Sequence, residues 1–99
     1  MALIISDTFG RPWREGLTNV AIGVAGLNPL LDYRGKTDGY GHPLSATVIA
    51  AADELAAAAE MVMGKLSSRP AAIIRHFAWR PEQGKASAMI RPREKDLFR

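Results

Sequence analysis

The 99-residue chain contains no cysteine and only two histidines. The absence of cysteine excludes disulfide bonds, thiolate zinc sites and cysteine nucleophiles, so the fold depends on packing. His42 and His76 are far apart in sequence and form no HExxH arrangement, so a turn or surface role is the simplest interpretation. No serine lies in a GxSxG context, which leaves a serine hydrolase unsupported. The sequence therefore identifies no catalytic residue.

Long hydrophobic runs are also absent. No run approaches the roughly 20 residues of a membrane span, and the start MALIISDTFG lacks the basic region of a signal peptide. We therefore expect a cytoplasmic protein that does not associate with membranes. The length predicts a single domain over residues 1–99. A hydrophobic fraction of 47% argues against global disorder.

The net charge of +3 is unevenly distributed. Residues 1–66 contain five Lys/Arg and seven Asp/Glu, whereas residues 67–99 contain eight and three. The basic end can be a solvated surface, a nucleic-acid tail, or a field that attracts a small polyanion such as a nucleotide. Because its positive residues are interrupted by apolar and acidic ones, and no nucleic-acid reading motif is present, a nucleic-acid partner is not expected.

Three apolar segments, residues 2–5, 18–27 and 71–77, are typical of strands. In the second segment, Gly23 and Gly26 would allow another backbone to approach closely. A loop is expected over residues 9–16, because this stretch holds two glycines and a proline. Residues 30–40 are expected to be irregular, and residues 81–84 to form a turn.

The alanine-rich stretch 47–63 predicts the clearest element, a long helix. Gly64 follows as the usual residue after a helix end, with Lys65 near the negative end of the helix dipole. A short helix is also expected over residues 86–90. Five side chains fall on one face of the long helix at helical spacing: Val48, Ala52, Leu55, Ala59 and Val62.

These elements predict an α+β (mixed α/β) fold, in which a small mixed sheet packs on one long alanine-rich helix. Three strands and one helix would leave the strand edges exposed. We therefore expect either a partner chain or a missing portion of a larger fold.

The stretch SDTFGRPWREG, residues 6–16, gathers side chains that suit an anionic ligand. Asp7 and Thr8 offer hard oxygen atoms to Mg²⁺ or Mn²⁺, although the same pair can end a strand in a simple turn. Arg11 and Arg14 flank Trp13, and arginine forks bind phosphate or carboxylate while an indole stacks on planar groups. A surface loop held by a half-buried tryptophan is the alternative.

Two further features lie on and after the long helix. Gly64 and Lys65 do not form a P-loop, since the GxxxxGK[ST] spacing is absent. Their main expected role is the helix end, with a nucleotide-facing loop as a second possibility. Asp53 and Glu54 are most simply a solvated acidic pair in the first helical turn, although one carboxylate could face a cation.

Several uncommon blocks recur in one order: SDTFGRPWR, TNVAIGVAGL, DYRGKTDGYG, VIAAADELAAAAE and VMGK, followed by AIIR, IRP and DLFR. In these blocks the chain closely resembles the coenzyme F420-0:L-glutamate ligase family, also called the F420 gamma-glutamyl ligase family. The resemblance covers essentially the whole chain. It is confined to the C-terminal part of that family, whose members are much longer.

The resemblance implies a ligase of coenzyme F420 biosynthesis that uses GTP and divalent metal, Mg²⁺ or Mn²⁺. In such a reaction the γ-phosphoryl group activates the terminal carboxylate of a deazaflavin coenzyme as an acyl phosphate, and the amine of L-glutamate displaces phosphate to form an amide. By the same resemblance, Asp7 and Thr8 would bind the metal. The nucleotide would contact the loop after the long helix, at Met63, Gly64 and Lys65.

The resemblance leaves other positions as hypotheses. Arg11, Trp13 and Arg14 would contact phosphate or the coenzyme. Some family members carry an amide where Lys65 stands; a protonated lysine cannot bind metal but could contact phosphate. His76 departs from a glycine that is common in the family, so its side chain would crowd a neighbouring backbone or alter the turn.

The family's N-terminal part, with further metal carboxylates, is not encoded in this sequence. We therefore expect the ligase site to be incomplete in the chain alone and to need a complementing N-terminal part or a homo-oligomer. The alternative is a non-catalytic oligomeric module that binds a nucleotide or a partner.

Overall fold

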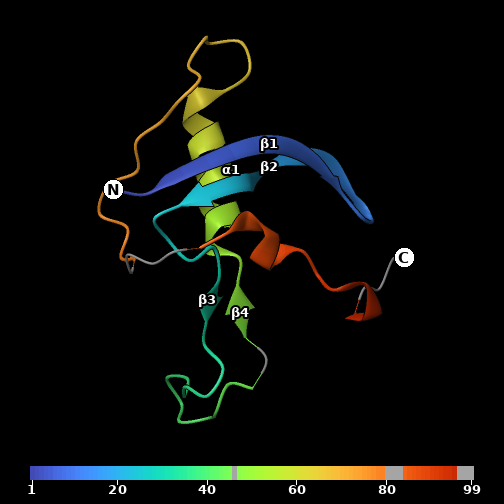
Figure 1. Ribbon diagram of the computed structural model, residues 1–99, viewed down its shortest axis with the longest axis vertical. Coiled ribbons are helices and arrows are strands. Elements are labelled where there is room, and N and C mark those ends of the chain that lie inside the picture. The colour runs from blue at the N-terminus through green and yellow to red at the C-terminus, as the bar shows by residue number, and fades with distance from the viewer. Residues whose placement is uncertain (46, 80–83, 96–99) are drawn as a thin grey trace.

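A long β-hairpin crosses a single α-helix at the centre of the molecule (Figure 1). The computed structural model describes residues 1–45, 47–79 and 84–95. Within them both sheets are two-stranded and antiparallel, which confirms the α+β class. In chain order the elements are β1 (Leu3–Arg11), β2 (Arg14–Ala25), β3 (Leu31–Asp32), β4 (Val48–Ile49), α1 (Ala51–Met63) and two 3₁₀ helices, η1 (Ala86–Met89) and η2 (Arg93–Lys95).

The hairpin of β1 and β2 is longer than predicted. The expected loop over residues 9–16 is wrong, because the strand pairing continues to the Arg11–Arg14 pair and leaves a turn of two residues. Pro12 fixes the first turn residue, and Trp13 takes a positive φ of 58° at the second. Register shifts between Ile5 and Ser6 and between Phe9 and Arg11 absorb the extra residues of β2.

Helix α1 packs its alanines against β2. Ala51, Ala52 and Ala56 are buried, and small side chains allow this close approach. The predicted apolar face is correct at Ala52, but Val62 at its far end is 63% exposed.

The helix begins at Ala51 rather than at residue 47. Val48 and Ile49 pair with β3 instead, as β-branched residues favour. The backbone N–H of Ala52 in the first turn donates to the Pro29 carbonyl at 3.1 Å. Because Pro29 is distant in sequence, this tertiary hydrogen bond gives no local signal.

The predicted close approach of a second backbone is confirmed at Gly26. This residue has a φ of +83°, and a Cβ placed there would lie 2.9 Å from the Met1 carbonyl oxygen. Only glycine adopts that conformation at low cost. Gly23 instead faces a side chain, since its added Cβ would meet Ile5 at 3.4 Å. Gly26 therefore fixes the start of β1 against the end of β2.

An arm, defined here as residues 31–49, projects away from the hairpin (Figure 1). Its base is the short β3–β4 ladder, and its walls are joined by backbone hydrogen bonds such as Gly35 N–H to the Leu44 carbonyl at 2.8 Å. At its tip, the Asp38 carboxylate accepts hydrogen bonds from the backbone N–H groups of Tyr40 and His42. The prediction of an irregular segment over 30–40 is correct outside Leu31 and Asp32.

The predicted strand over residues 71–77 is wrong. The segment has no strand partner, every residue from 70 to 79 is exposed, and no backbone hydrogen bond joins it to another described residue. His76 has a φ of +66°, a conformation that interrupts a strand. The expected helix over 86–90 is the 3₁₀ helix η1. The turn expected over residues 81–84 lies, apart from Gly84, outside the described residues.

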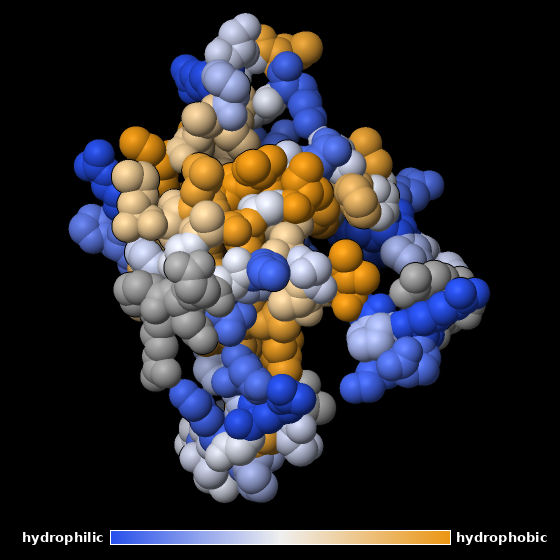
Figure 2. Space-filling view, in the orientation of Figure 1, coloured by the Kyte–Doolittle hydropathy of each residue, from blue (hydrophilic) through white to orange (hydrophobic). Residues whose placement is uncertain are grey.

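The chain exposes far more surface than an independent domain of its size. Its accessible surface is 8246 Å², whereas a folded monomer of this mass exposes about 5,500 Å². Its radius of gyration is 15.1 Å, against about 13 Å for a compact domain of 100 residues. Leu3, Ile5 and Ile22 are exposed, and Figure 2 shows apolar side chains gathered over β1 and β2. This architecture fits a part of a larger fold.

None of the helices in the described ranges combines the length and the apolar character needed to cross a membrane.

Candidate functional site

A small polar cluster joins the hairpin to the segment after α1. Thr8 of β1 lies opposite Asn19 of β2, and the Thr8 hydroxyl donates to Asn19 Oδ1 at 3.3 Å, a long contact for this pair. Lys65 Nζ donates to Thr8 Oγ1 at 2.6 Å. Asn19 is buried and Thr8 is half-buried, whereas Lys65 is exposed. The cluster thus connects a buried amide with solvent.

The end of α1 directs Lys65 back toward the hairpin. Gly64 follows the helix with a φ of +63°, and its N–H donates to the Glu60 carbonyl at 2.8 Å. This conformation, which favours glycine, reverses the chain direction. The Ser67 hydroxyl donates to the Met63 carbonyl and closes the turn. The predicted helix end at Gly64 is therefore confirmed.

The Thr8 hydroxyl has a defined orientation in this cluster. Its proton points to Asn19 Oδ1, since an amide oxygen only accepts. Its lone pairs are then available to a cation, and the Lys65 ammonium occupies that direction. Asn19 therefore positions the oxygen of Thr8 for a positively charged neighbour.

Asp7 lies next to Thr8 but on the other face of the strand. Successive side chains of a strand alternate, and Asp7 is exposed where Thr8 is half-buried. The Asp7 carboxylate Oδ1 accepts from the Thr8 backbone N–H at 2.8 Å, so it is turned toward the Thr8 backbone. Both residues lie in the middle of β1, not at the strand end where the sequence had placed them.

The oxygen donors around Thr8 fit part of a magnesium or manganese shell. Mg²⁺ is commonly held by one or two carboxylates, with waters and substrate phosphates completing six positions. Asp7 offers a carboxylate on one face of β1, whereas Thr8 and Asn19 offer neutral oxygens on the other. In the described part of the chain, no three acidic or histidine side chains gather as a metal site. A tightly held ion would need further ligands from outside these residues.

The three hairpin-tip residues singled out in the sequence lie apart from this cluster. Arg11 is three positions beyond Thr8, or about 10 Å along a strand. Its guanidinium donates to the Glu15 carbonyl at 3.0 Å. Trp13 at the turn is 88% exposed, and Arg14 is exposed as well. The structure therefore brings Thr8 and Lys65 together but places the cationic tip at a separate end of the hairpin.

The two acidic residues of the first helical turn have different roles. Asp53 Oδ1 accepts from the backbone N–H of Ala21 at 2.9 Å, next to the register shift of β2. Its carboxylate thus ties α1 to the hairpin, whereas Glu54 is exposed. The simple solvated interpretation holds for Glu54 alone.

Charged residues also lie at the base of the arm. Arg34 Nη2 and Asp32 Oδ2 form an ion pair at 2.6 Å. The hydrogen bonds from Arg34 lower the pKa of Asp32 from its ordinary value of 3.8 to about 2. The carboxylate raises the pKa of Arg34 in turn.

Sequence reasoning did not identify Asn19 or the anchoring role of Asp53. Asn19 stands inside TNVAIGVAGL, a block interpreted only as a strand. A polar residue in a mainly apolar segment is a usable signal, because a buried amide needs a partner. Asp53 gave no such signal, since acidic residues are common in a first helical turn.

Comparison with known proteins places these residues in a family of ligases. Residues 1–76 match the family described as F420-0:Gamma-glutamyl ligase. The chain is 52% identical over 102 residues to coenzyme F420:L-glutamate ligase of Methanothermobacter thermautotrophicus. The identity to the same-named proteins of Methanopyrus kandleri and Methanocaldococcus jannaschii is 46% over 106 residues and 44% over 100 residues.

The chain belongs to the F420-0:gamma-glutamyl ligase family. All of the chain is covered in each of these comparisons, but only 40% of the Methanothermobacter and Methanocaldococcus proteins and 41% of the Methanopyrus protein. It thus spans about two-fifths of the length of these curated relatives. The sequence-based resemblance is confirmed, together with its restriction to a part of the family's length.

Proposed function

We propose that this chain forms one wall of a ligase site that joins L-glutamate to coenzyme F420-0 with GTP and a divalent metal ion. The γ-phosphoryl group of GTP passes to the terminal carboxylate of the coenzyme, giving an acyl phosphate and GDP. The amine of L-glutamate then attacks the acyl carbon, phosphate leaves, and an amide bond forms. This overall reaction is carried over from the family resemblance.

One observation supports the proposal most strongly. Thr8, expected to bind metal, and Lys65, expected to contact nucleotide, are 57 residues apart in the chain but share a hydrogen bond of 2.6 Å. A helix end with a purely structural role would not require a contact between these two residues. The contact brings the two positions close enough to serve one metal-bound triphosphate.

The residues of the cluster have distinct proposed tasks. By the family resemblance, Thr8 Oγ1 would hold Mg²⁺ or Mn²⁺, with Asn19 keeping the Thr8 hydroxyl oriented. The Asp7 carboxylate would join the same ion only by turning away from the Thr8 backbone N–H. A bound ion would neutralise charge on the phosphate oxygens. Lys65, as a flexible ammonium, would leave Thr8 and donate to a phosphate oxygen. Repulsion between the two cations favours that movement, because both cannot occupy the lone-pair direction of Thr8.

The test uses the assembled protein. The chain is co-expressed with the portion of the Methanothermobacter relative that lies outside the matched region, and ligase activity is assayed with GTP, Mn²⁺, L-glutamate and F420-0. We expect product from the assembly and little or none from the chain alone. Lys65→Met should weaken GTP binding at least tenfold, or about 1.4 kcal/mol, through loss of a charged hydrogen bond.

The matched control is Lys95→Met, because Lys95 is exposed and lies in η2. It should leave GTP binding within twofold of the wild type. Equal GTP binding by the Lys65→Met protein would contradict the proposed phosphate contact. Robust product from the chain alone would contradict the incompleteness of its site.

A non-catalytic partner-binding module is the second candidate. The observation that favours it is the single carboxylate near Thr8, together with the large exposed surface. An assembly that binds a partner but forms no product under the same assay would support this candidate instead.

A further inference from the structure

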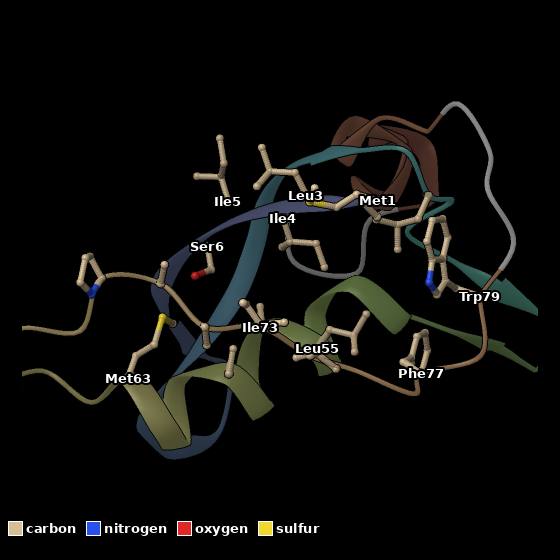
Figure 3. A pocket seen from close by; sticks show the side chains of 18 residues that line it. Met1, Leu3, Ile4, Ile5, Ser6, Leu55, Met63, Ile73, Phe77 and Trp79 are labelled. Atoms are coloured by element: carbon tan, nitrogen blue, oxygen red, sulfur yellow. The ribbon is translucent and has the colours of Figure 1, made fainter.

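An apolar groove of about 680 Å³ runs between β1, helix α1 and residues 70–79. Figure 3 shows Ile4 and Leu55 pointing into it, with Ile73 near its middle. In this view Met1 and Trp79 lie toward one end, and Ser6 and Met63 toward the other. Among the described residues of the lining, only Ser6 and Trp79 carry a polar side-chain group, a hydroxyl and an indole N–H. An anionic nucleotide therefore does not suit this groove.

One wall of the groove is the unpaired edge of β1. All six residues from 1 to 6 line it, although alternate side chains of a strand point to opposite faces. A groove on one face of a strand would contact only alternate residues. A groove along the strand edge contacts the backbone and therefore every successive residue. In the described residues β1 pairs with β2 alone, so its other edge carries no strand.

The opposite wall is an extended apolar segment without backbone partners. Five successive residues, 70–74, line the groove. As noted for the predicted strand over 71–77, no backbone hydrogen bond joins residues 70–79 to another described residue. Ile73 is 80% exposed despite its apolar side chain. Two facing backbones with unused hydrogen-bonding groups form a slot for a third, since an open edge is a template for strand addition.

We infer that this groove receives an extended apolar strand from the three-fifths of the family protein that the chain does not span. The inserted strand pairs with the open edge of β1 and gives residues 71–74 the strand partner that they lack. The lengths of the relatives support this occupant, because most of their sequence lies outside the matched region. This inference rests on the proposed function, in which the ligase site of the chain is incomplete. It identifies the surface to which the remaining part would bind.

The β1 strand of a second copy is a poorer occupant. It already carries β2 on one edge, so it could pair with only one wall of the slot. An inserted strand with two open edges can pair with both walls.

The test is amide hydrogen exchange on the assembly described above, compared with the chain alone. We expect the amides of residues 71–74, and those of residues 3–6 that point away from β2, to exchange at least tenfold more slowly in the assembly. The amides of the arm at 33–44 serve as the internal control and should not change. Ile73→Lys should reduce co-purification of the two parts at least tenfold.

Leu66→Lys is the matched control, because Leu66 is 98% exposed and lies outside the groove. It should co-purify like the wild type. Because both substituted side chains are exposed, circular dichroism should show equal folding of both variants.

Four outcomes would overturn the inference. These are failure of the two parts to associate, association without protection of both segments, normal co-purification of the Ile73→Lys protein, or the same protection in the chain alone. In the last case, dependence on concentration would identify a second copy as the occupant, and independence would show that 71–77 closes onto β1. Ligase activity is measured separately: a protected but inactive assembly refutes the proposed function alone, and an active assembly without protection refutes the groove.

Discussion

The hairpin–helix unit, formed by β1, β2 and α1, and the arm at residues 31–49 are stabilised in different ways. The unit depends on contacts between distant residues, such as the Asp53 carboxylate with the Ala21 N–H and Gly26 with the Met1 carbonyl. The arm depends on nearby groups, including the Asp32–Arg34 pair and the turn around Asp38. The arm can therefore keep its local turns while it projects into solvent, whereas the unit forms only when remote segments meet.

The largest expected effect follows from Gly26→Ala. The substitution forces a β-carbon into a left-handed conformation and to 2.9 Å from the Met1 carbonyl oxygen. We expect the free energy of unfolding to fall by about 2–3 kcal/mol. Urea denaturation measures this change. Gly39→Ala in the arm is the control, since an added Cβ there meets nothing within 4 Å. An equal fall in the free energy of unfolding for the two substitutions would show that the two regions do not differ in this way.

An intermediate effect is expected for Asp53→Ala. This substitution leaves the Ala21 N–H without its carboxylate partner and loosens α1 from β2. The free energy of unfolding should fall by about 1–2 kcal/mol more than in the Glu54→Ala protein. Glu54 is the matched control, because it has the same charge in the same helical turn but is exposed. A difference near zero would show that the Asp53 carboxylate does not hold the helix to the hairpin.

The smallest effect is expected when the pH is lowered and the Asp32–Arg34 ion pair in the arm is lost. The pKa of Asp32 is lowered from 3.8 to about 2, so its pairing with Arg34 favours the folded arm above about pH 4 and is lost as the pH falls toward 2. We expect the NMR amide signals of Leu31, Asp32 and Val48 to shift in that window, with little change in overall stability. Asp32→Asn should abolish the shift. A midpoint near 4 would show that the ion pair is not formed in solution.

The sequence predicted the parts of the fold that local chemistry determines. The alanine-rich run gave α1, Gly64 gave its end, and the apolar segments gave both strands of the hairpin. The start of the helix was wrong because Val48 and Ile49 pair with β3, and the Pro29 carbonyl completes the first helical turn. Such tertiary contacts override helix propensity and are not visible in a local pattern.

The predicted strand at 71–77 failed for a related reason. Its composition favours a strand, but a strand needs a neighbour, and the described residues supply none at that position. The candidate site was predicted in part: family resemblance selected Thr8 and Lys65, and the structure adds their contact and Asn19. The metal and nucleotide roles of these residues stay predictions.

The open edge of β1 allows two competing associations. A newly made chain with a bare strand edge and an apolar slot can join its complement or stack with copies of itself, and the second route accelerates with concentration. Under the proposed strand insertion, the supply of the complementary strand would therefore govern how much of the protein stays soluble.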